Sequence, residues 1–229
     1  MSTSSYRARR GFRTGAMLWR VEADPGDMRI LPDGAMDLMW SENRFLFAGA
    51  DTTVMISSSE SGGVTWGLRL APGTAYALLG VPARELIDQR FELSELIAVP
   101  ARVIDTAHTD PAAALEHLFV TLWEQAAPAR SALRRAASLD RAARAGLSVS
   151  DIADLHGLSE RSLRRVCDMV FGYGPKTLAS IHRLQYALHL ARSGRPLGEA
   201  SAMAGYVDQS HLNRDARRLA GATPGQLVA

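Results

Sequence analysis

The sequence predicts an α+β protein in which a β-rich N-terminal part, followed by helices, leads into an all-helical C-terminal part. Short apolar stretches separated by turn residues fill residues 17–107, whereas apolar residues recur at helical spacing from residue 110 onward. The chain has 229 residues, of which 47% are hydrophobic and 22% charged. It is therefore expected to bury the core of one large domain or two small ones.

The β-rich part is indicated by alternation along two stretches of the chain. Apolar side chains occupy every second position in Met36, Leu38 and Trp40, and again in Trp66, Leu68 and Leu70. Turn signals lie around them at Asp24-Pro25-Gly26, Pro32-Asp33-Gly34, Ser61-Gly62-Gly63 and Pro72-Gly73. This pattern is typical of a small antiparallel β-unit, with short helices expected over residues 74–79 and 93–97.

Two helices are expected to follow the β-unit. The dipeptide Asp110-Pro111 supplies an N-cap and a proline at the first helical position, and Leu115 and Leu118 continue with amphipathic spacing. A second helix, rich in Ala and Arg, is expected over residues 129–145. The apolar stripe of the first helix either packs on its own β-unit or pairs two subunits, and both interpretations remain open.

The C-terminal part contains two similar helical units. Each has a short helix, a turn that contains glycine, and a second helix whose inner face is apolar and whose outer face is rich in arginine. Ser159 and Asp208 are the expected N-caps of the two second helices, and a longer helix over residues 176–192 connects the units. This arrangement is typical of the helix-turn-helix.

The outer faces of the two second helices carry groups that could read DNA. A helix fits the major groove, where guanidinium, amide and hydroxyl groups can contact base edges and phosphates. The candidates in the first unit are Ser159, Arg161, Ser162, Arg164 and Arg165. The candidates in the second unit are Gln209, Ser210, His211, Asn213, Arg214 and Arg217. Basic residues exceed acidic ones in residues 145–229, whereas residues 1–144 are nearly balanced.

The spacing of the two units also favours DNA binding. The connecting helix has 17 expected residues and should be about 25 Å long. With its flanking loops it can place two recognition helices about 34 Å apart, which is one turn of DNA. His211 is equally suited to contact a base or a phosphate.

Five motifs mark the C-terminal part: Ser159-Glu160-Arg161-Ser162-Leu163-Arg164-Arg165, Gly172-Tyr173-Gly174-Pro175, Arg183-Leu184-Gln185, Ala204-Gly205-Tyr206-Val207-Asp208-Gln209-Ser210-His211-Leu212-Asn213-Arg214 and Gly221-Ala222-Thr223-Pro224. With these motifs, residues 148–229 resemble the DNA-binding domain of AraC/XylS-type transcription regulators. The resemblance implies two helix-turn-helix units in one chain. It also implies that the arginines of the first unit and residues 209–214 of the second meet DNA.

The sequence departs from this family at four positions. Cys167, Leu212 and Ala216 stand where the family usually has Phe, and Ala200 stands where it usually has Ile. Each change removes core volume, so the second unit is expected to be less stable on its own or to read DNA less strictly. Asp215 would repel phosphate, and we expect it to face away from DNA.

The N-terminal part also carries motifs of a known kind, over residues 31–40, 48–52, 67–73 and 78–82. Through these motifs, residues 17–107 resemble an uncharacterised domain that often precedes AraC-type DNA-binding domains. The resemblance implies a sensor-like β-rich module, for which a cupin-like fold is one option. The candidates for lining a ligand pocket are Met36, Met39, Trp40, Trp66 and Tyr76, with Asp37 and Arg69 as polar groups. For the aromatic residues, plain core packing is the more frequent alternative.

These observations predict a disordered tail over residues 1–16, a sensor or dimerisation domain over residues 17–146, and the DNA-binding domain over residues 147–229. No catalytic constellation, cofactor loop or metal-spaced histidine pair is present in the sequence, so neither an enzyme nor a metal or cofactor site is expected. The lone Cys167 and the absence of a long apolar run indicate a cytoplasmic protein without membrane contact.

The predicted function is that of a sequence-specific transcription regulator that binds double-stranded DNA and is controlled by a small molecule or a partner at the N-terminal domain. Homodimerisation and contact with RNA polymerase are further options. One alternative is a ligand-independent regulator whose N-terminal domain only dimerises or binds a protein. Another is a thiol-based alkyl-transfer or redox sensor using Cys167, although its place in an apolar stripe favours buried core.

Overall fold

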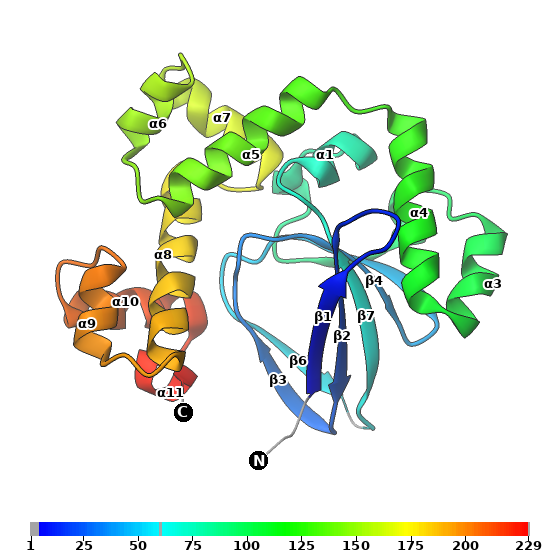
Figure 1. The fold of residues 1–229 in the computed structure, drawn as a ribbon, viewed down its shortest axis with the longest axis horizontal. Coiled ribbons are helices and arrows are strands. Elements are labelled where there is room, and N and C mark those ends of the chain that lie inside the picture. Colours follow the sequence, from blue (N-terminus) through cyan, green and yellow to red (C-terminus); the bar gives the residue numbers. More distant parts are fainter. Residues whose placement is uncertain (1–4, 60, 229) are drawn as a thin grey trace.

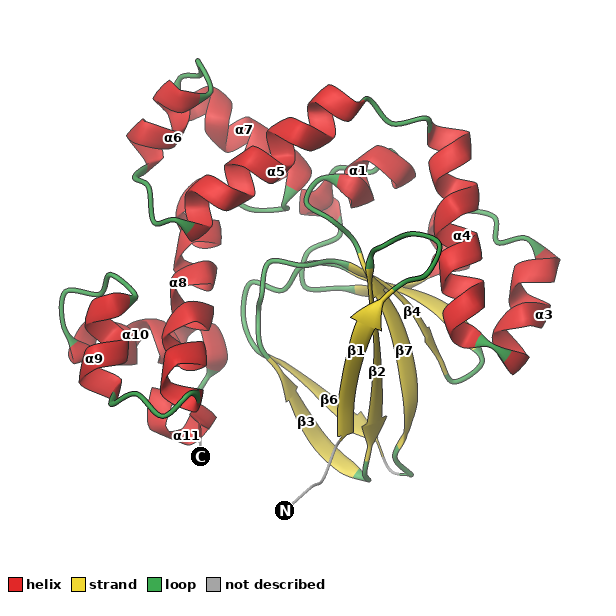
Figure 2. Ribbon diagram, in the orientation of Figure 1, coloured by secondary structure: helices red, strands yellow, loops and turns green. Residues whose placement is uncertain are grey.

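The computed structural model describes residues 5–59 and 61–228. Figures 1 and 2 show a β-rich N-terminal unit with flanking helices beside an all-helical C-terminal unit. The predicted fold class, a β-rich part followed by helices and then by an all-α part, is confirmed. We refer to the β-rich part with the helices up to residue 146 as the sensor unit.

The sensor unit is built on a six-stranded antiparallel sheet with the strand order β1-β2-β7-β4-β5-β8. Its strands are β1 (Ser5–Arg10), β2 (Met17–Ala23), β7 (Gly63–Arg69), β4 (Asp37–Ser41), β5 (Arg44–Ala48) and β8 (Arg90–Glu92). A second, two-stranded sheet pairs β3 (Gly26–Ile30) with β6 (Met55–Ser59). This hairpin lies across the concave side of the larger sheet (Figure 1).

The pairing register gives the larger sheet two different faces. Leu18 pairs with Leu68, and Leu68 also pairs with Leu38, so three fully buried leucines form a row on one face. That face packs against helices and forms the core. The neighbouring row of Trp19, Gly67 and Met39 points to the other face, because successive side chains of a strand alternate.

The helices of the sensor unit follow β7 in sequence, with α1 and η1 standing before the last strand, β8. They are α1 (Thr74–Leu79), the 3₁₀-helix η1 (Ala83–Glu85), α2 (Leu93–Leu96), α3 (Ala101–Thr109), α4 (Pro111–Ala126) and α5 (Arg130–Arg144). The predicted N-cap is confirmed, since the Asp110 carboxylate accepts a hydrogen bond of 3.0 Å from the backbone N–H of Ala113. In the apolar stripe of α4, Leu115, Leu118 and Leu122 are buried and pack within their own unit, whereas Trp123 is half-buried.

The prediction of a disordered tail is wrong for residues 5–16, while residues 1–4 lie outside the described part of the chain. Residues 5–10 form the edge strand β1, which pairs with β2 along its whole length. The turn over residues 11–16 is held by the buried carboxylate of Glu116 on α4. Its Oε1 atom accepts hydrogen bonds from the backbone N–H groups of Arg13 (2.8 Å) and Thr14 (2.9 Å) and from the Thr14 hydroxyl (3.0 Å).

This contact has an electrostatic consequence. Burial on its own would raise the pKa of Glu116, but the hydrogen bonds from Thr14 and Arg13 outweigh it and lower the pKa. The charged carboxylate is therefore the form that the turn stabilises. Gly11 lies so close to Glu116 that a Cβ atom there would come within 2.4 Å of Oε1, which explains a glycine at this position.

The C-terminal unit consists of six helices among the described residues. They are α6 (Val149–Leu155), α7 (Glu160–Val170), α8 (Pro175–Arg192), α9 (Leu197–Met203), α10 (Gln209–Ala220) and α11 (Pro224–Val228). Helix α8 runs between the pair α6–α7 and the pair α9–α10 (Figure 2). The sequence predicted each of these helices except α11, which follows the Thr223-Pro224 stop signal as one extra turn.

The two units are in direct contact along α8. The Gln185 side chain donates a hydrogen bond of 2.7 Å to the Pro32 carbonyl of the sensor unit. On α8, His182 Nε2 lies 2.8 Å from Asp140 Oδ1 of α5, and both residues are buried. Within the described ranges, no helix is long and apolar enough to cross a bilayer.

Candidate nucleic-acid interface

The two recognition helices, α7 and α10, begin at the residues that the sequence indicated. The Ser159 hydroxyl accepts a hydrogen bond of 3.2 Å from the backbone N–H of Ser162, and the Asp208 carboxylate accepts one of 2.6 Å from that of His211. Each cap satisfies one of the free N–H groups of the first turn and fixes where the helix starts. The N-terminal end of each helix is thus well defined.

Both recognition helices bury one side and expose the other. On α7 the buried side chains are Leu163 and Cys167, and on α10 they include Leu212 and Ala216. Cys167, Leu212 and Ala216, three of the positions at which the sequence departs from the family that it resembles, are thus core positions. None of the predicted DNA-contact residues is buried. Ser162, His211 and Asn213 are half-buried, and the others are exposed: Ser159, Arg161, Arg164, Arg165, Gln209, Ser210, Arg214 and Arg217.

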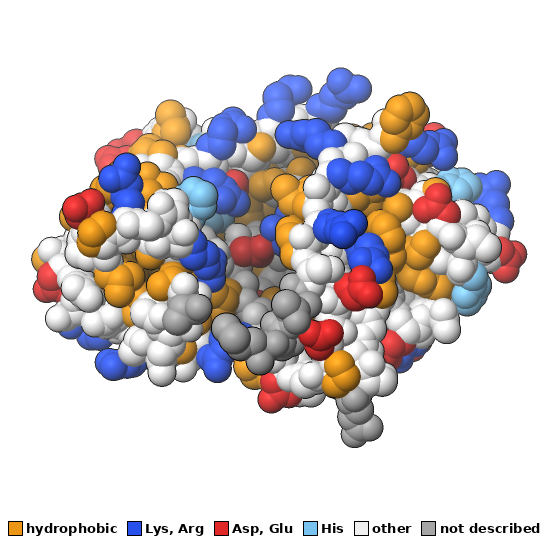
Figure 3. All heavy atoms as spheres, turned by 60° about the horizontal axis from the view of Figure 1, so that its bottom comes forward, with side chains coloured by type: hydrophobic (Ala, Val, Ile, Leu, Met, Phe, Trp, Pro, Cys, Tyr) orange, Lys and Arg blue, Asp and Glu red, His pale blue; other side chains and the backbone are white. Residues whose placement is uncertain are grey.

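The exposed arginines of both helices are largely free to meet an external anion. Arg161, Arg165, Arg214 and Arg217 form no ion pair with any described side chain, and Arg164 has only Asp168 at 3.8 Å. Lys and Arg side chains also gather across the upper and middle part of the molecular face shown in Figure 3. Unpaired guanidinium groups on a helix surface are well suited to phosphates and to guanine edges.

Asp215 faces away from this exposed surface, as predicted. Its side chain is 13% exposed and forms an ion pair of 2.8 Å with Arg218. The carboxylate also lies near Tyr206, whose pKa is raised by burial and by Asp215. The negative charge is therefore paired within the second unit.

His211 is oriented by the aromatic residue of the Gly205-Tyr206 turn. The two rings meet edge to face at a centroid distance of 5.0 Å, and the Arg183 guanidinium lies 5.4 Å from the Tyr206 ring. Tyr206 is buried, so it holds the start of α10 against α8. The imidazole of His211 is half-buried and keeps a fixed position near the capped end of the helix.

The C-terminal ends of both recognition helices contact the sensor unit. Behind α7, a Cβ atom at Gly172 would lie 2.1 Å from Ile87 Cγ2 and 2.9 Å from the Ala83 carbonyl oxygen, so the backbone there packs tightly on η1. Behind α10, Arg29 Nη1 of β3 donates a hydrogen bond of 3.1 Å to the Ala220 carbonyl. The N-terminal ends remain outside, and these are the ends that contact base edges in helix-turn-helix proteins.

The environment of Cys167 does not suit thiol chemistry. The side chain is 1% exposed, and burial raises the pKa of the thiol to about 12. A nucleophilic cysteine needs an accessible thiolate, which this site disfavours at neutral pH. The interpretation of Cys167 as core is supported over the thiol-sensor alternative.

A separate cavity of about 490 Å³ lies between the concave face of the large sheet and the β3–β6 hairpin. Its apolar lining includes Trp19, Met28, Met39, Leu46 and Met55, and its charged lining includes Asp33, Asp37, Arg69 and Arg90. The volume lies in the range of small-molecule sites. Sequence reasoning named Asp37, Met39 and Arg69 but missed the other lining residues, because alternation alone does not say which face of a strand the helices cover.

Of the seven predicted pocket residues, Asp37, Met39 and Arg69 line this cavity. The prediction is wrong for Met36 and Trp40, which are buried in the core on the opposite face of the sheet. Trp66 is on that face as well, where the Arg20 guanidinium lies 5.8 Å from its ring. Tyr76 on α1 lines a different hollow, between α1, α5 and the end of α7.

Arg69 is the centre of the charged group in this cavity. Its guanidinium lies 2.7 Å from Asp33 Oδ2 and 3.4 Å from Asp37 Oδ1. Burial on its own would lower the pKa of Arg69, but Asp37 and Asp33 outweigh it and raise the pKa. Burial raises the pKa of Asp37, although Arg69 and a hydrogen bond of 2.8 Å from Trp19 Nε1 oppose that shift.

The loop that carries Asp33 connects this cavity to α8. Asp33 binds Arg69 on one side, while the carbonyl of Pro32, the preceding residue, accepts the hydrogen bond from Gln185 on the other. Gly34 has a φ of 81°, and a Cβ atom there would lie 3.0 Å from His182 Cε1. One tight turn thus contacts both the cavity and the helix between the two DNA-binding units.

Comparisons with known proteins match both parts of the chain. Residues 152–229 match a family described as a helix-turn-helix domain, and residues 16–92 match a "Domain of unknown function (DUF6597)". No curated protein matches the chain.

Three solved structures illustrate the similarity. The C-terminal domain of AraT, a response regulator from Geobacillus stearothermophilus, is 22% identical, with a TM-score of 0.36, over 39% of this chain and 83% of that one. A probable AraC family transcriptional regulator from Rhodopseudomonas palustris is 24% identical, with a TM-score of 0.36, over 43% of this chain and 94% of that one. ToxT from Vibrio cholerae is 8% identical, with a TM-score of 0.47, over 99% and 96%.

Proposed function

We propose that this chain, an AraC-type DNA-binding regulator by its C-terminal domain, reads a specific DNA site with both helix-turn-helix units under the control of a ligand in the sensor unit. The observation that carries the proposal is the orientation of α7 and α10. Both helices contact the sensor unit with their C-terminal ends and keep their capped, basic N-terminal ends outside.

The two outer faces are assigned complementary roles. On α7, Arg161, Arg164 and Arg165 contact guanine edges and phosphates, and the hydroxyls of Ser159 and Ser162 contact phosphates at the capped end. On α10, the readout groups are Gln209, Ser210, His211, Asn213, Arg214 and Arg217. Helix α8, with 18 residues and a length of about 27 Å, sets the distance between the two recognition helices.

DNA binding is tested with a site selected from a random DNA library by the full chain. Arg165→Ala and Arg214→Ala should each weaken binding to that site about 5- to 150-fold, which is the worth of one bidentate arginine–guanine contact. Each change should also relax the base preference at one position of the site. Arg102→Ala on α3 is the matched control, since it removes an exposed arginine far from both recognition helices.

The salt dependence of the same binding separates DNA recognition from a protein-interaction role of the helical units. Phosphate contacts release counterions, so the affinity should fall steeply with salt for the wild type and less steeply for a variant that has lost a phosphate contact. Unchanged affinity and base preference in both arginine variants would contradict the residue assignment. A chain that selects no site would contradict the proposed function.

Control by a ligand is assigned to the concave cavity and to the Pro32-Asp33-Gly34 turn. A ligand that engages Arg69 competes with Asp33 for the guanidinium and so alters the turn that contacts Gln185 and His182. Because the turn contacts α8, this change alters the relative placement of the two DNA-binding units. Coupling between two sites in one protein is typically about 1–3 kcal/mol.

The coupling can be tested without knowing the ligand. Asp33→Ala removes the ion pair with Arg69 and should shift the affinity for the selected DNA site about 5- to 150-fold in the ligand-free protein. Asp27→Ala on β3 is the matched control, because that exposed carboxylate bonds to Ser58 at the surface. If the Asp33→Ala variant bound the DNA site with the same affinity as the wild type, the result would favour the alternative in which the sensor unit acts without a ligand.

A further inference from the structure

An apolar pocket of about 630 Å³ lies on the sensor unit, apart from the concave cavity. It is formed by the turn over residues 11–16, the segment over residues 71–74 and the helices α4 and α5. Its volume lies in the range of small-molecule sites. Among the described residues, none lines both this pocket and the concave cavity, so the two are separate.

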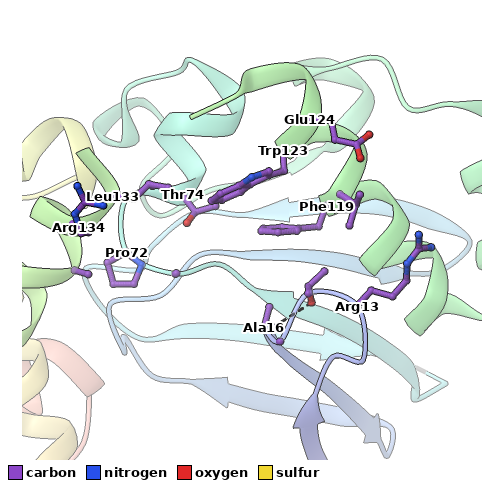
Figure 4. Close-up of a pocket in the computed structure, with 14 residues that line it drawn as sticks. Arg13, Ala16, Pro72, Thr74, Phe119, Trp123, Glu124, Leu133 and Arg134 are labelled. Atoms are coloured by element: carbon purple, nitrogen blue, oxygen red, sulfur yellow. Dashed lines mark hydrogen bonds between the residues drawn. The ribbon is translucent and has the colours of Figure 1, made fainter. Parts of the chain in front are cut away.

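Two aromatic side chains of α4 form one wall of the pocket. Figure 4 shows Phe119 and Trp123 extending into it. Their rings are stacked, with a centroid distance of 5.7 Å and an angle of 28° between their planes. Both residues are half-buried, whereas Leu118 and Leu122 beside them are buried in the core. Part of each aromatic side chain thus stays outside the core, and this surface suits another flat ring system.

The opposite wall, which is the turn over residues 11–16, is held in place by hydrogen bonds. Within the turn, the Gly11 N–H donates to the Ala16 carbonyl at 2.7 Å. The buried Glu116 carboxylate of α4 accepts bonds from the backbone of Arg13 and Thr14. Because both walls are already ordered, a ligand that enters between them loses little binding energy to ordering the protein.

The charged residues of the pocket lie at its two ends. Figure 4 shows Arg134 of α5 at one end, with Arg13 and Glu124 toward the other. None of these three side chains forms an ion pair with another described residue. Together they carry one net positive charge, which a monoanion balances. Apart from Thr14 and Thr74, the other described lining residues are apolar or glycine, which disfavours a sugar.

We propose that this pocket is a second small-molecule site, which binds a planar aromatic carboxylate. The ring system stacks on Phe119 and Trp123, and the carboxylate bonds to the guanidinium of Arg134, the arginine at the end away from Glu124. An aromatic ring matches the apolar lining, and one carboxylate matches the net charge. This site is additional to the control assigned to the concave cavity and does not rest on it.

The charge assignment is tested by isothermal titration calorimetry of the full chain with quinaldate, a planar aromatic acid, and with its neutral amide, quinaldamide. Arg134→Ala should weaken quinaldate binding about 10-fold, because it removes a charge-assisted hydrogen bond, and should leave quinaldamide binding unchanged. Arg141→Ala is the matched control, since it removes an exposed arginine of the same helix outside the pocket. Unchanged quinaldate affinity in Arg134→Ala would overturn the proposal.

The stacking assignment is tested with the same two probes. Trp123→Ala should weaken both about 10-fold, because the flat surface under the ring is lost. Since Trp123 also packs on the core, Ala137→Trp is the second variant. It fills the pocket from α5, at a half-buried position, and should abolish the binding of both probes. Urea unfolding of each variant shows that the loss of binding is not a loss of folding.

Three further results would each overturn the proposal. A wild-type chain that does not bind quinaldate would show that the pocket takes no aromatic acid. Wild-type affinity in Ala137→Trp would show that the probe binds elsewhere, the concave cavity included. Quinaldate binding that weakens as the protein concentration rises, together with a dimer in sedimentation, would show that a second copy covers the pocket. All these measurements are made without DNA, so they stand or fall separately from the proposed function.

Discussion

The two helix-turn-helix units share one design but differ in how they are joined to the sensor unit. Both have a capped recognition helix with a basic outer face. The first unit is joined by close backbone packing, since Gly172 lies against Ala83 and Ile87, and the flanking Phe171 and Tyr173 are buried. The second is joined more lightly, by the hydrogen bond of the exposed Arg29 to the end of α10 and by Val54, whose Cγ1 lies 3.2 Å from where a Cβ of Gly221 would stand.

This difference predicts which helix-turn-helix unit is displaced when the sensor unit changes. Tightly packed surfaces tolerate little displacement, whereas a single polar contact is exchanged at low cost. A change in the sensor unit is therefore expected to leave the first unit in place and to shift the second. The predictions below test the two junctions, beginning with the one whose disturbance should cost most.

Gly172→Ala should destabilise the chain by about 4 kcal/mol. Its φ of 89° strains any L-residue, and the added Cβ would meet Ile87 Cγ2 at 2.1 Å and the Ala83 carbonyl at 2.9 Å. Gly194→Ala is the control, because Gly194 has a φ of 92° and nothing within 4 Å, and it should cost only about 1 kcal/mol. Urea unfolding measures both, and equal costs would show that the first junction is not tightly packed.

Asp140→Asn should cost about 2 kcal/mol at neutral pH by weakening the hydrogen bonds of Asp140 with His182 of α8 and with Arg144 of its own helix. Burial alone would raise the pKa of Asp140, but the hydrogen bonds from His182 and Arg144 lower it. The stabilisation is thus complete above the ordinary pKa of 3.8 and is lost as the pH falls through the lowered value. Urea midpoints from pH 6 down to pH 2 should therefore decline less in the variant than in the wild type.

Arg29→Ala should change the free energy of unfolding by less than about 1 kcal/mol, because it removes one partly exposed hydrogen bond. Its effect should instead be seen in DNA binding. With the second unit released, the variant should tolerate one inserted base pair between the two half-sites better than the wild type does. Fluorescence anisotropy with the two DNA lengths measures this. If the variant and the wild type preferred the same spacing, the Arg29 hydrogen bond would not be what holds the second unit in position.

Sequence reasoning was most successful where structure is determined locally. The caps Asp110, Ser159 and Asp208 were each predicted, because a short polar side chain before an amphipathic run specifies a helix start within four residues. The inward orientation of Asp215 was also predicted, and the ion pair with Arg218 explains it. The assignment of the outer residues to DNA contact stays a prediction that the binding experiments test.

The features that the sequence did not predict depend on contacts between residues that lie far apart in the sequence. Strand β1 is exposed along its whole length and rich in arginine, so it has no hydrophobic alternation to detect. Its order depends on Glu116, which is about 100 positions away in the sequence. The pocket was predicted only in part, through Asp37, Met39 and Arg69, because alternation reveals two faces of a strand but not which face the helices cover. Trp40 therefore belongs to the core, and its neighbours Asp37 and Met39 belong to the cavity.

The contact of the sensor unit with the C-terminal ends of both α7 and α10 has a consequence for building chimeric regulators. A C-terminal domain grafted from a relative would bring its own residues to the positions of Gly172 and Ala220, where they must fit Ile87 and Arg29 of the recipient. Exchange of operator specificity is therefore better made by transplanting only the outward residues of α7 and α10. The graft then leaves both junctions, and the response they transmit, intact.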